Sequence, residues 1–578
     1  MPPPGLRNLP LAKPREFVPP HGDASDWSQV EPLFLKLAGE APRLRNSKAL
    51  VRWLLQASEL AAFLMEEEAR CYIRMTCQTD DPSAERAYLH YIERIEPRAK
   101  PHWHRLQKLY LACPQRRKLP RSRWLVHDRE TRKDVELFRE KSIPLQTQEA
   151  KLEQQYQKRM AAMTIAFRGQ ELTLQQAGRY LEENEREVRE EVWRRIAARR
   201  LRDRAALDRC YEELLALRYR IARNAGFPSY REYVFRARSR FDYTPRDCEA
   251  FHGAVAESVV PLARELQARR ARLLGLPRLR PWDLNVDPRG RPPLRPFDGV
   301  QTLMDKTQEV FRRIEPSLGQ DFARMRSFGL LDLESRKGKA PGGYQHTLEE
   351  ARLPFIFMNA VGLQRDVETL LHEGGHAFHT LAVRDEPLVL YRHAPLEFCE
   401  VASMTMELLA GPHLEVFYAK PEAKRARRAH LEGVVNLLCW IAVIDAFQHW
   451  VYTHPRHTRA QRAKEWVRLL DQFGGNEDWS GLESGRARLW HRQPHLFTSP
   501  FYYIEYGIAQ LGALQVWQRA QRDLDRAVRA YRRALALGRS VPLPDLFRAA
   551  GIRFDFSARI VKPLVKRVQR ELEALEDA

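Results

Sequence analysis

Apolar residues recur at every third or fourth position along most of this chain, which is the periodicity of amphipathic α-helices. The pattern is clearest over residues 49–76, 84–95 and 146–163, and a second helical block begins near Glu183. Segments that alternate between apolar and polar residues, as strands do, are few. The chain is therefore predicted to be mainly α.

Three short segments carry strand patterns. Residues 164–174 predict a β-hairpin with its turn at Arg168-Gly169, and residues 344–347 and 354–359 predict single strands. The last of these comes just before a strong helical pattern at residues 366–383. We expect a small sheet beside that helix.

The 578 residues are 44% hydrophobic and exceed the usual size of a single domain. We expect a proline-rich segment at residues 1–24, an N-terminal helical domain at residues 25–185 and a second domain at residues 186–578. Residues 434–447 form the most apolar run, but polar residues interrupt it. It predicts a buried helix, and we expect no association with a membrane.

Seven cysteines are scattered singly along the chain, and no Cys-x-x-Cys occurs. An odd number without close pairs favours a reduced compartment over a disulfide framework. The N-terminus is rich in proline and has no apolar segment typical of a secretory signal. We therefore expect a cytoplasmic protein.

Residues 372–379 read His-Glu-Gly-Gly-His-Ala-Phe-His inside the predicted helix. His372 and His376 are four residues apart, so both imidazoles project from one face and can bind a single tetrahedral zinc. Glu373 can contact a water at the open position of that metal. Adjacent glycines at 374 and 375 cost a helix about 1 kcal/mol each, and a helix tolerates them where a neighbour must pack closely.

A third zinc ligand is expected in the helical pattern at residues 395–409. Glu400 and Glu407 are seven residues apart and share a face, so one can bind metal while the other accepts a hydrogen bond from a histidine. Glu397 is a competing ligand, and spacing leaves both possibilities open. A fourth protein ligand would close the position that water needs, so His379 is predicted to pack or hydrogen-bond near the site.

His-Glu-x-Gly-His-x-x-His, followed by Glu-Val-Ala-Ser at residues 400–403, resembles the M3 family of zinc oligopeptidases, in particular the oligoendopeptidase F and Pz-peptidase branch. The resemblance runs from about residue 190 to the end. It implies that Glu400 is the third ligand of one Zn²⁺ per chain and that Glu407 lies behind the histidines. It also implies a two-lobed α-helical zincin-type metallopeptidase with a small β-sheet beside the zinc helix and a deep substrate channel.

The segment from His495 to Tyr506 contains neutral hydrogen-bond donors. Tyr503 and Tyr506 are three residues apart on one helical face, and a Thr-Ser-Pro turn after His495 could fold that side chain back beside them. Donors of this kind stabilise the negative charge that amide hydrolysis builds on the carbonyl oxygen. Spacing alone favours core packing for such a cluster. The resemblance implies catalytic roles for His495 and Tyr506, and with them Tyr503.

The resemblance also implies contacts to substrate. In a zincin, an extended substrate adds to an edge strand beside the zinc helix, and residues 355–359 are expected to be that edge. The residues expected to bind substrate are Phe357, Asn359, Gly343, Tyr344 and Tyr502.

The formal charge of +21 raises the question of an anionic partner. Arginines are mixed with acidic residues along predicted helices, as over residues 183–203, and such stretches mostly form i,i+4 pairs. No zinc-finger, helix-turn-helix or RNA-binding motif is visible, so no nucleic-acid partner is expected. A positive channel that prefers acidic or free-carboxylate peptides is the more modest inference.

The function implied by the resemblance is a zinc-dependent oligoendopeptidase of short peptides, with Glu373 as general base. One alternative is a zinc carboxypeptidase of the His-Glu-x-x-His type. The other is a non-enzymatic peptide-binding protein on a peptidase scaffold, although such a protein would be expected to lose Glu373. No oligomeric state follows from the sequence.

Overall fold

The computed structural model describes Leu6 and residues 9–575, and the other residues of the predicted proline-rich segment lie outside the described residues. Helices make up most of the described chain, so the prediction of a mainly α fold is confirmed. The strands are β1 (Thr164–Phe167), β2 (Gln170–Thr173), β3 (Leu331–Glu334), β4 (Tyr344–Leu348) and β5 (Leu353–Ala360).

The α-helices in the first half of the chain are α1 (Trp27–Glu40), α2 (Ser47–Cys77), α3 (Pro82–His90), α4 (Glu96–Ala112), α5 (Arg121–Leu137), α6 (Ile143–Ala161), α7 (Leu174–Gly178), α8 (Arg186–Arg202), α9 (Arg204–Asn224), α10 (Tyr230–Ala237), α11 (Pro245–Ser258) and α12 (Val260–Leu273). Those in the second half are α13 (Gly299–Ile314), α14 (Pro316–Ser327), α15 (Gln364–Ala382), α16 (Val389–Arg392), α17 (Leu396–Ala410), α18 (Lys420–Thr453), α19 (Arg459–Phe473), α20 (Glu483–Arg486), α21 (Pro494–Thr498), α22 (Tyr503–Ala520), α23 (Leu524–Leu535), α24 (Leu543–Ala549) and α25 (Ala558–Ala574).

The three-stranded sheet lies beside α15, and its edge strand is not the one that was expected. The predicted strands are present as β4 and β5, which pair antiparallel. A further strand, β3, pairs parallel with the other side of β5, so the order is β3-β5-β4. The expectation that residues 355–359 form a sheet edge is therefore wrong: β5 is the central strand, and β4 is the edge strand next to it.

The predicted hairpin is present as β1 and β2, which pair from Thr164 with Thr173 to Phe167 with Gln170. Arg168 and Gly169 both have positive φ, 50° and 77°. This is the backbone of the tight turns that match the twist of a two-residue hairpin, and glycine adopts it without strain.

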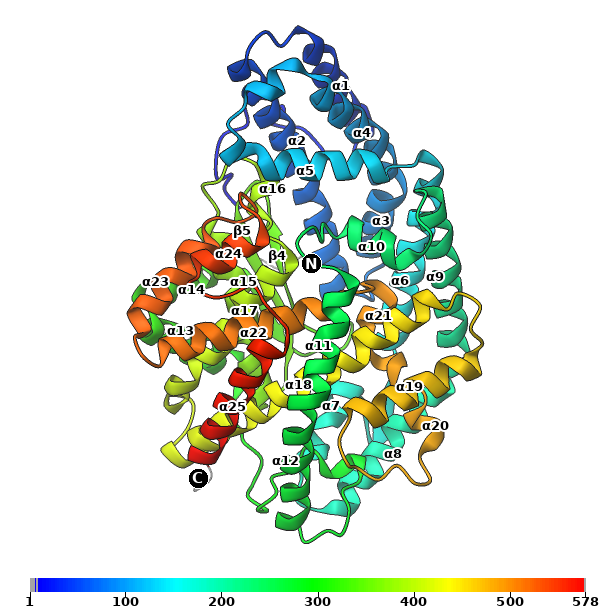
Figure 1. Cartoon of the computed structure of the whole chain (residues 1–578), viewed down its shortest axis with the longest axis vertical. Helices are drawn as coiled ribbons and strands as arrows, with labels where there is room; N and C mark the ends of the chain where they lie inside the picture. Colours follow the sequence, from blue (N-terminus) through cyan, green and yellow to red (C-terminus); the bar gives the residue numbers. More distant parts are fainter. Residues whose placement is uncertain (1–5, 7–8, 576–578) are drawn as a thin grey trace.

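Two large hydrophobic cores support the fold, beside a small cluster around the β1–β2 hairpin. The smaller core joins buried residues between Phe17 and Val126 to Leu388 and Tyr391. The larger core contains the end of α2, α6, the sheet and most helices from α9 onward. Figure 1 shows α1, α4 and α5 at one end of the long axis and α8, α12 and α20 toward the other. Because α6 packs into the larger core, the domain boundary near residue 185 stays a prediction.

Helix α18 contains the apolar run predicted at residues 434–447. It is long and apolar enough to cross a membrane by length and composition, but 61% of its apolar window is buried inside the protein. Its buried side chains belong to the larger core, where α18 packs against α11, α19 and α22. The prediction of a buried helix is confirmed.

Candidate active site

Helices α15 and α17 pack very closely because of Gly375, and the neighbouring Gly374 leaves room for a ring of α13. A Cβ atom on Gly375 would lie 2.6 Å from the carbonyl oxygen of Ala402 and from Cα of Ser403. A Cβ atom on Gly374 would lie 2.5 Å from the ring of Phe311. Real Cβ atoms do not approach other atoms so closely, so any larger residue at 375 would push α17 away. The close packing brings side chains of α17 to the histidines of α15.

Three predicted zinc ligands converge at this contact. Nε2 of His372 lies 3.3 Å from Oε2 of Glu400, and Nε2 of His376 lies 3.5 Å from the same oxygen. Zinc bonds of about 2.0–2.1 Å at tetrahedral angles place ligand atoms roughly 3.3 Å apart. Two imidazoles and one carboxylate are also the ligand set of many catalytic zinc sites. The three residues, called the zinc cluster below, therefore fit one Zn²⁺.

Glu407 lies behind the zinc cluster and holds two histidines. Its Oε1 accepts a hydrogen bond from Nδ1 of His372 at 2.6 Å, and its Oε2 pairs with Nε2 of His430 on α18 at 2.9 Å. Burial opposes ionisation of this carboxyl, but these hydrogen bonds lower the pKa of Glu407 to about 2. The first contact fixes the orientation of His372 and leaves its Nε2 free to bind metal.

His430 was not assigned a role from the sequence. It lies 23 residues after Glu407 on a different helix, so no local spacing connects the two.

The two residues that competed for ligand positions have other surroundings. Glu397 is buried and accepts a 2.7 Å hydrogen bond from the hydroxyl of Tyr243. His379 is buried, and its ring lies 6.3 Å from that of Phe398. Burial lowers the pKa of His379 to about 3, so its imidazole is neutral. Neither residue belongs to the zinc cluster.

Glu373 lies next to the zinc cluster and has an unused oxygen. The residue is 6% exposed, and its Oε2 has no hydrogen-bond partner among the described residues. Burial raises the pKa of Glu373 above its ordinary value, although His372 and His376 oppose the shift. A buried carboxylate with a free lone pair and a raised pKa is well suited to accept a proton.

Four side chains from the C-terminal part of the chain lie opposite the zinc cluster. Nε2 of His495 lies 3.2 Å from the hydroxyl of Tyr506, and the hydroxyl of Tyr502 donates to Oε1 of Glu400 at 2.5 Å. The ring of Tyr503 lies 5.0 Å from that of His495. The prediction that these residues lie near one another is thus confirmed. The hydrogen bond between Tyr502 and Glu400 connects them to α17.

Burial keeps these donors neutral. It raises the pKa of Tyr502 and Tyr506 well above 10, and the nearby Glu400 carboxylate adds to both shifts. The pKa of Tyr506 is raised further by Glu373, so this phenol lies near both carboxylates. Burial lowers the pKa of His495 to about 4. At neutral pH the two phenols carry protons, and the imidazole has one N–H to donate.

Gln493 was missed by the sequence analysis and orients His495. Its Nε2 lies 2.9 Å from Nδ1 of His495, and its Oε1 accepts from the indole N–H of Trp440 at 3.0 Å. Its position two residues before His495 was the only signal in the sequence. Because Gln493 is itself held by Trp440, the imidazole has one favoured orientation.

The residues expected to bind substrate are arranged around the sheet. Phe357 is fully buried and stacks on Tyr344 with ring centroids 4.7 Å apart. The side-chain amide of Asn359 donates to the carbonyls of Ala340 and Gly342, which fixes the loop before β4. Phe357 and Asn359 thus have internal contacts. Gly343 and Tyr344 lie at the start of the edge strand β4.

Strand β4 runs beside the zinc helix. Thr347 of β4 lies 3.1 Å, hydroxyl to hydroxyl, from Thr380 of α15. A Cβ atom on Gly343 would lie 3.1 Å from the Thr369 methyl group, nearly three turns earlier on α15. The edge strand therefore lies alongside the helix that carries the histidines.

A second group of potential ligands lies in the helical interior. Cys248 of α11 and Asp445 and His449 of α18, called the interior cluster below, also place their ligand atoms within 4.8 Å of one another. His252 contacts Asp445 at 2.8 Å between Nε2 and Oδ2. No spacing in the sequence connects Cys248 to Asp445 and His449.

Comparisons with known proteins extend over most of the chain. The sequence profile of peptidase family M3 matches residues 179–565. Oligopeptidase PepF of Bacillus subtilis (strain 168) is 24% identical over 333 residues, which cover 55% of this chain and 47% of PepF. The chain thus spans about half the length of the curated relatives that it matches.

Solved structures match over a larger share. A structure of Pz peptidase A with an inhibitor superimposes with a TM-score of 0.92 at 26% identity, and covers 97% of this chain and 99% of its own. A structure described as an oligoendopeptidase F also gives a TM-score of 0.92, with 28% identity and the same coverage. The whole fold, including both helical ends, is therefore shared with these proteins.

Proposed function

The chain belongs to peptidase family M3, and from this premise we propose that it is a zinc-dependent oligoendopeptidase, which hydrolyses internal peptide bonds of short peptides. The observation that carries the proposal is the convergence of His372, His376 and Glu400 beside the unpartnered carboxylate oxygen of Glu373. The names of its relatives, oligopeptidase PepF and oligoendopeptidase F among them, support the same activity.

In this proposal the zinc cluster holds one Zn²⁺ per chain. A metal ion bound there supplies Lewis-acid polarisation of the substrate carbonyl and lowers the pKa of water. Glu407 keeps Nε2 of His372 directed at the metal, and Tyr502 holds one oxygen of Glu400 by its hydrogen bond. The ligands are thus oriented by neighbours before metal arrives, which favours affinity.

Glu373 would act as the general base. It accepts the proton of the attacking water and later delivers it to the leaving amine. Its burial raises its pKa, and a base whose pKa is closer to neutrality is also a better acid in the second step.

Tyr506 and His495 would stabilise the developing charge. As water attacks, the carbonyl oxygen becomes negative, and preorganised neutral donors lower the energy of that state. The two side chains already contact one another at 3.2 Å. Both are neutral at neutral pH, so each can donate a hydrogen bond to the developing charge.

Strand β4 would bind the substrate main chain. It is the edge strand beside α15, and an extended peptide can add to such an edge through backbone hydrogen bonds. Backbone recognition is independent of side chains, which suits an enzyme for varied short peptides. We place the reaction in the cytoplasm, where the seven free cysteines remain reduced.

A quenched fluorescent peptide of about ten residues tests the proposal. Zinc-loaded protein is expected to cleave it at an internal bond, with the position mapped by mass spectrometry, and Glu373→Gln protein is expected not to. Release of single residues from the C-terminus would instead favour a carboxypeptidase. Binding of the peptide without any cleavage would favour a peptide-binding protein.

A further inference from the structure

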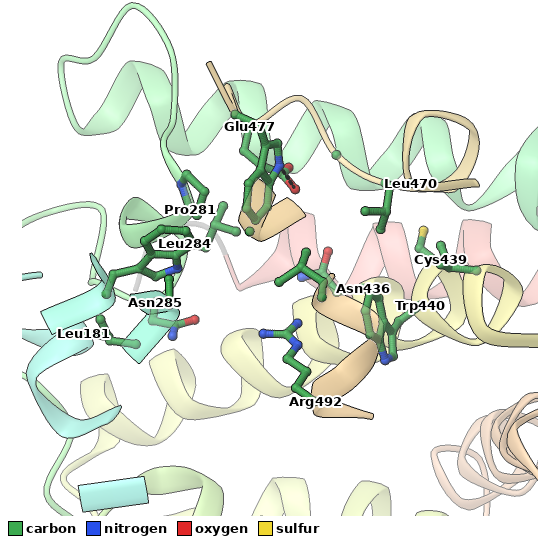
Figure 2. Close-up of a pocket in the computed structure, with 18 of the residues that line it drawn as sticks. Leu181, Pro281, Leu284, Asn285, Asn436, Cys439, Trp440, Leu470, Glu477 and Arg492 are labelled. Atoms are coloured by element: carbon green, nitrogen blue, oxygen red, sulfur yellow. Dashed lines mark hydrogen bonds between the residues drawn. The ribbon is translucent and has the colours of Figure 1, made fainter. Parts of the chain in front are cut away.

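A large cavity lies next to the proposed catalytic donors. It has a volume of about 570 Å³ and is enclosed by α8, α12, α18, α19 and the segment from Trp479 to Arg492. Its lining includes the aromatic side chains of Trp193, Trp440 and Trp479. Figure 2 shows Arg492 projecting into this space beside Asn436 and Trp440, with Pro281, Leu284 and Glu477 on other sides.

Arginines outnumber carboxylates in the lining of this cavity. The lining arginines are Arg200, Arg270, Arg365, Arg488 and Arg492, and the lining carboxylates are Glu432 and Glu477. Both carboxylates are already engaged. Glu432 forms ion pairs with Arg270 and Arg428 at 3.6 and 2.9 Å. Glu477 accepts hydrogen bonds from Gln267 and Trp479.

Arg200 and Arg492 are left without a negative partner. Across residues 9–575, no carboxylate forms an ion pair or hydrogen bond with either guanidinium, and Arg492 instead lies over the ring of Trp440 at 5.3 Å. The Nε atom of Arg200 is buried and has no hydrogen-bond partner in the part of the chain that the structure describes. The Arg492 side chain is exposed to solvent and lines the cavity.

The two arginines line one cavity, so their positive charges repel each other across it. Burial lowers the pKa of Arg200 to about 10, and the charge of Arg492 is the next largest cause of that shift. Arg200 is partly buried, so a like charge nearby without a counterion adds to the cost of keeping its guanidinium charged. An anion between them would remove that cost and gain charge-assisted hydrogen bonds.

The cavity is connected to the proposed catalytic centre at two points. Trp440 of its wall donates to Gln493, which contacts His495. Arg492 lines the cavity and precedes His495 by only three residues, and three residues of chain span at most about 11 Å. An extended peptide advances about 3.3 Å per residue. A substrate with its reacting bond at the zinc cluster would thus reach this cavity about three residues away.

We propose that Arg200 and Arg492 form a subsite that binds a carboxylate of the peptide substrate about three residues from the cleaved bond. The inference rests on the proposed peptidase function and adds a substrate class to it. The carboxylate can be the C-terminus of a short peptide or an acidic side chain, because both present the same two oxygens to a guanidinium. Such a subsite would fix the position of cleavage relative to a negative charge.

Three peptides that differ in one carboxylate test the subsite. They share one sequence and have a free C-terminus, an amidated C-terminus, or an amidated C-terminus with Glu in place of Gln three residues from the cleaved bond. We expect zinc-loaded protein to have a KM about 10- to 100-fold lower for a peptide with a carboxylate in reach than for the neutral one, with similar kcat. If the peptide with the free C-terminus has the lower KM, the terminus is bound. If the peptide with Glu has the lower KM, the acidic side chain is bound.

Arg492→Gln and Arg200→Gln are expected to reduce this preference to within about 3-fold, while the KM for the neutral peptide changes little. Arg529→Gln is the matched control: it removes the same charge from an exposed position on α23, so the preference should remain. Equal KM values for charged and neutral peptides in the unaltered protein would overturn the inference, as would an equal loss of preference in Arg529→Gln.

Equilibrium binding of the same peptides, labelled with a fluorophore, separates this inference from the proposed function. If no peptide is cleaved but the charged ones bind more tightly and lose that advantage in Arg492→Gln, the subsite is correct and the peptidase function is wrong. If peptides are cleaved and bind without regard to charge, the peptidase function holds and the subsite is wrong.

Discussion

The zinc cluster and the interior cluster have similar donors in very different surroundings. In each, three potential ligand atoms lie within 4.8 Å of one another among the described residues. In the zinc cluster the side chains of His372 and His376 are 21% and 16% exposed. In the interior cluster Asp445 has no exposed surface, and the side chain of His449 is 7% exposed.

Their neighbours differ as well. The interior cluster is bounded by aromatic rings, with Phe501 5.2 Å from His449 between ring centroids, and His252 pairs with its carboxylate. Burial raises the pKa of Cys248 well above that of a free thiol, whereas a thiol must ionise to bind zinc. The zinc cluster instead adjoins Glu373 and the neutral donors. A catalytic site needs an accessible position and a base beside it, and nearby donors alone do not supply them.

The largest expected effect comes from removing the shared carboxylate of the zinc cluster. Glu400→Gln should lose bound zinc and nearly all turnover, because a neutral amide is a poor zinc ligand. Glu397→Gln on the same helix is the matched control and should keep both. Metal analysis of purified protein gives the answer. Retention of zinc by Glu400→Gln with loss in Glu397→Gln would reverse the ligand assignment.

Glu373→Gln should separate metal binding from chemistry. We expect full zinc content, an unchanged fold, and kcat lower by about 10³- to 10⁴-fold, because an amide cannot accept the proton. Kinetics on protein of verified zinc content measure the effect. Substantial remaining hydrolysis would mean that another group is the base.

Tyr506→Phe tests the side of the site that faces the zinc cluster. We expect kcat and kcat/KM to fall together by about 10- to 1000-fold with little change in KM, because the lost hydrogen bond acts mainly in the transition state. Zinc content should stay the same. A rise in KM alone would make Tyr506 a contact for bound substrate, and no effect would return it to core packing.

Glu407→Gln should weaken zinc binding without abolishing it. Loss of the charge behind His372 is expected to lower zinc affinity by about 10- to 100-fold, measured by competition with a chelator. Glu368→Gln on α15 removes a nearby carboxyl whose hydrogen-bond partner is Gln364 and which, among the described residues, forms no ion pair with either zinc histidine, so it serves as the control. Equal zinc affinity in Glu407→Gln and the unaltered protein would show that the hydrogen bond does not orient the ligand.

Cys248→Ser should have the smallest effect. We expect one zinc per chain before and after the change, and kcat within about 2-fold, because the interior cluster takes no part in the reaction. A zinc content near two that falls to one in Cys248→Ser would show that the interior cluster also binds metal. Burial would then not prevent metal binding at that cluster.

The metal-binding motif on α15 could be predicted from the sequence because its residues are close together in the chain. The spacing of His372 and His376 specifies one helical face whatever surrounds it. Spacing could not separate Glu397 from Glu400, since both lie on one helix within a turn. The structure separates them through a partner 154 residues away, Tyr243, which contacts Glu397. His430 and Gln493 were missed for the same reason: their roles arise from contacts between elements.

The sheet shows a different limit of sequence reasoning. The two strands with clear patterns were found, but a strand's place within a sheet depends on what pairs on its far side. The third strand, β3, is only four residues long, and it pairs with β5 in parallel from an earlier part of the chain. The sequence of residues 355–359 alone does not indicate that β3 pairs with this strand. The expected edge was consequently assigned to the wrong one of two correctly predicted strands.

Because Gly375 has no side chain, α17 can lie close enough to α15 for Glu400 to reach the two histidines. In a saturation library scored for growth or turnover, substitutions at 375 should be as damaging as substitutions at a zinc ligand, although this residue carries no functional group. Alanine, the most conservative choice, already requires the backbone of Ala402 and Ser403 to move. A substitution at Gly375 would therefore change the affinity for metal through the distance between α15 and α17, without altering any ligand.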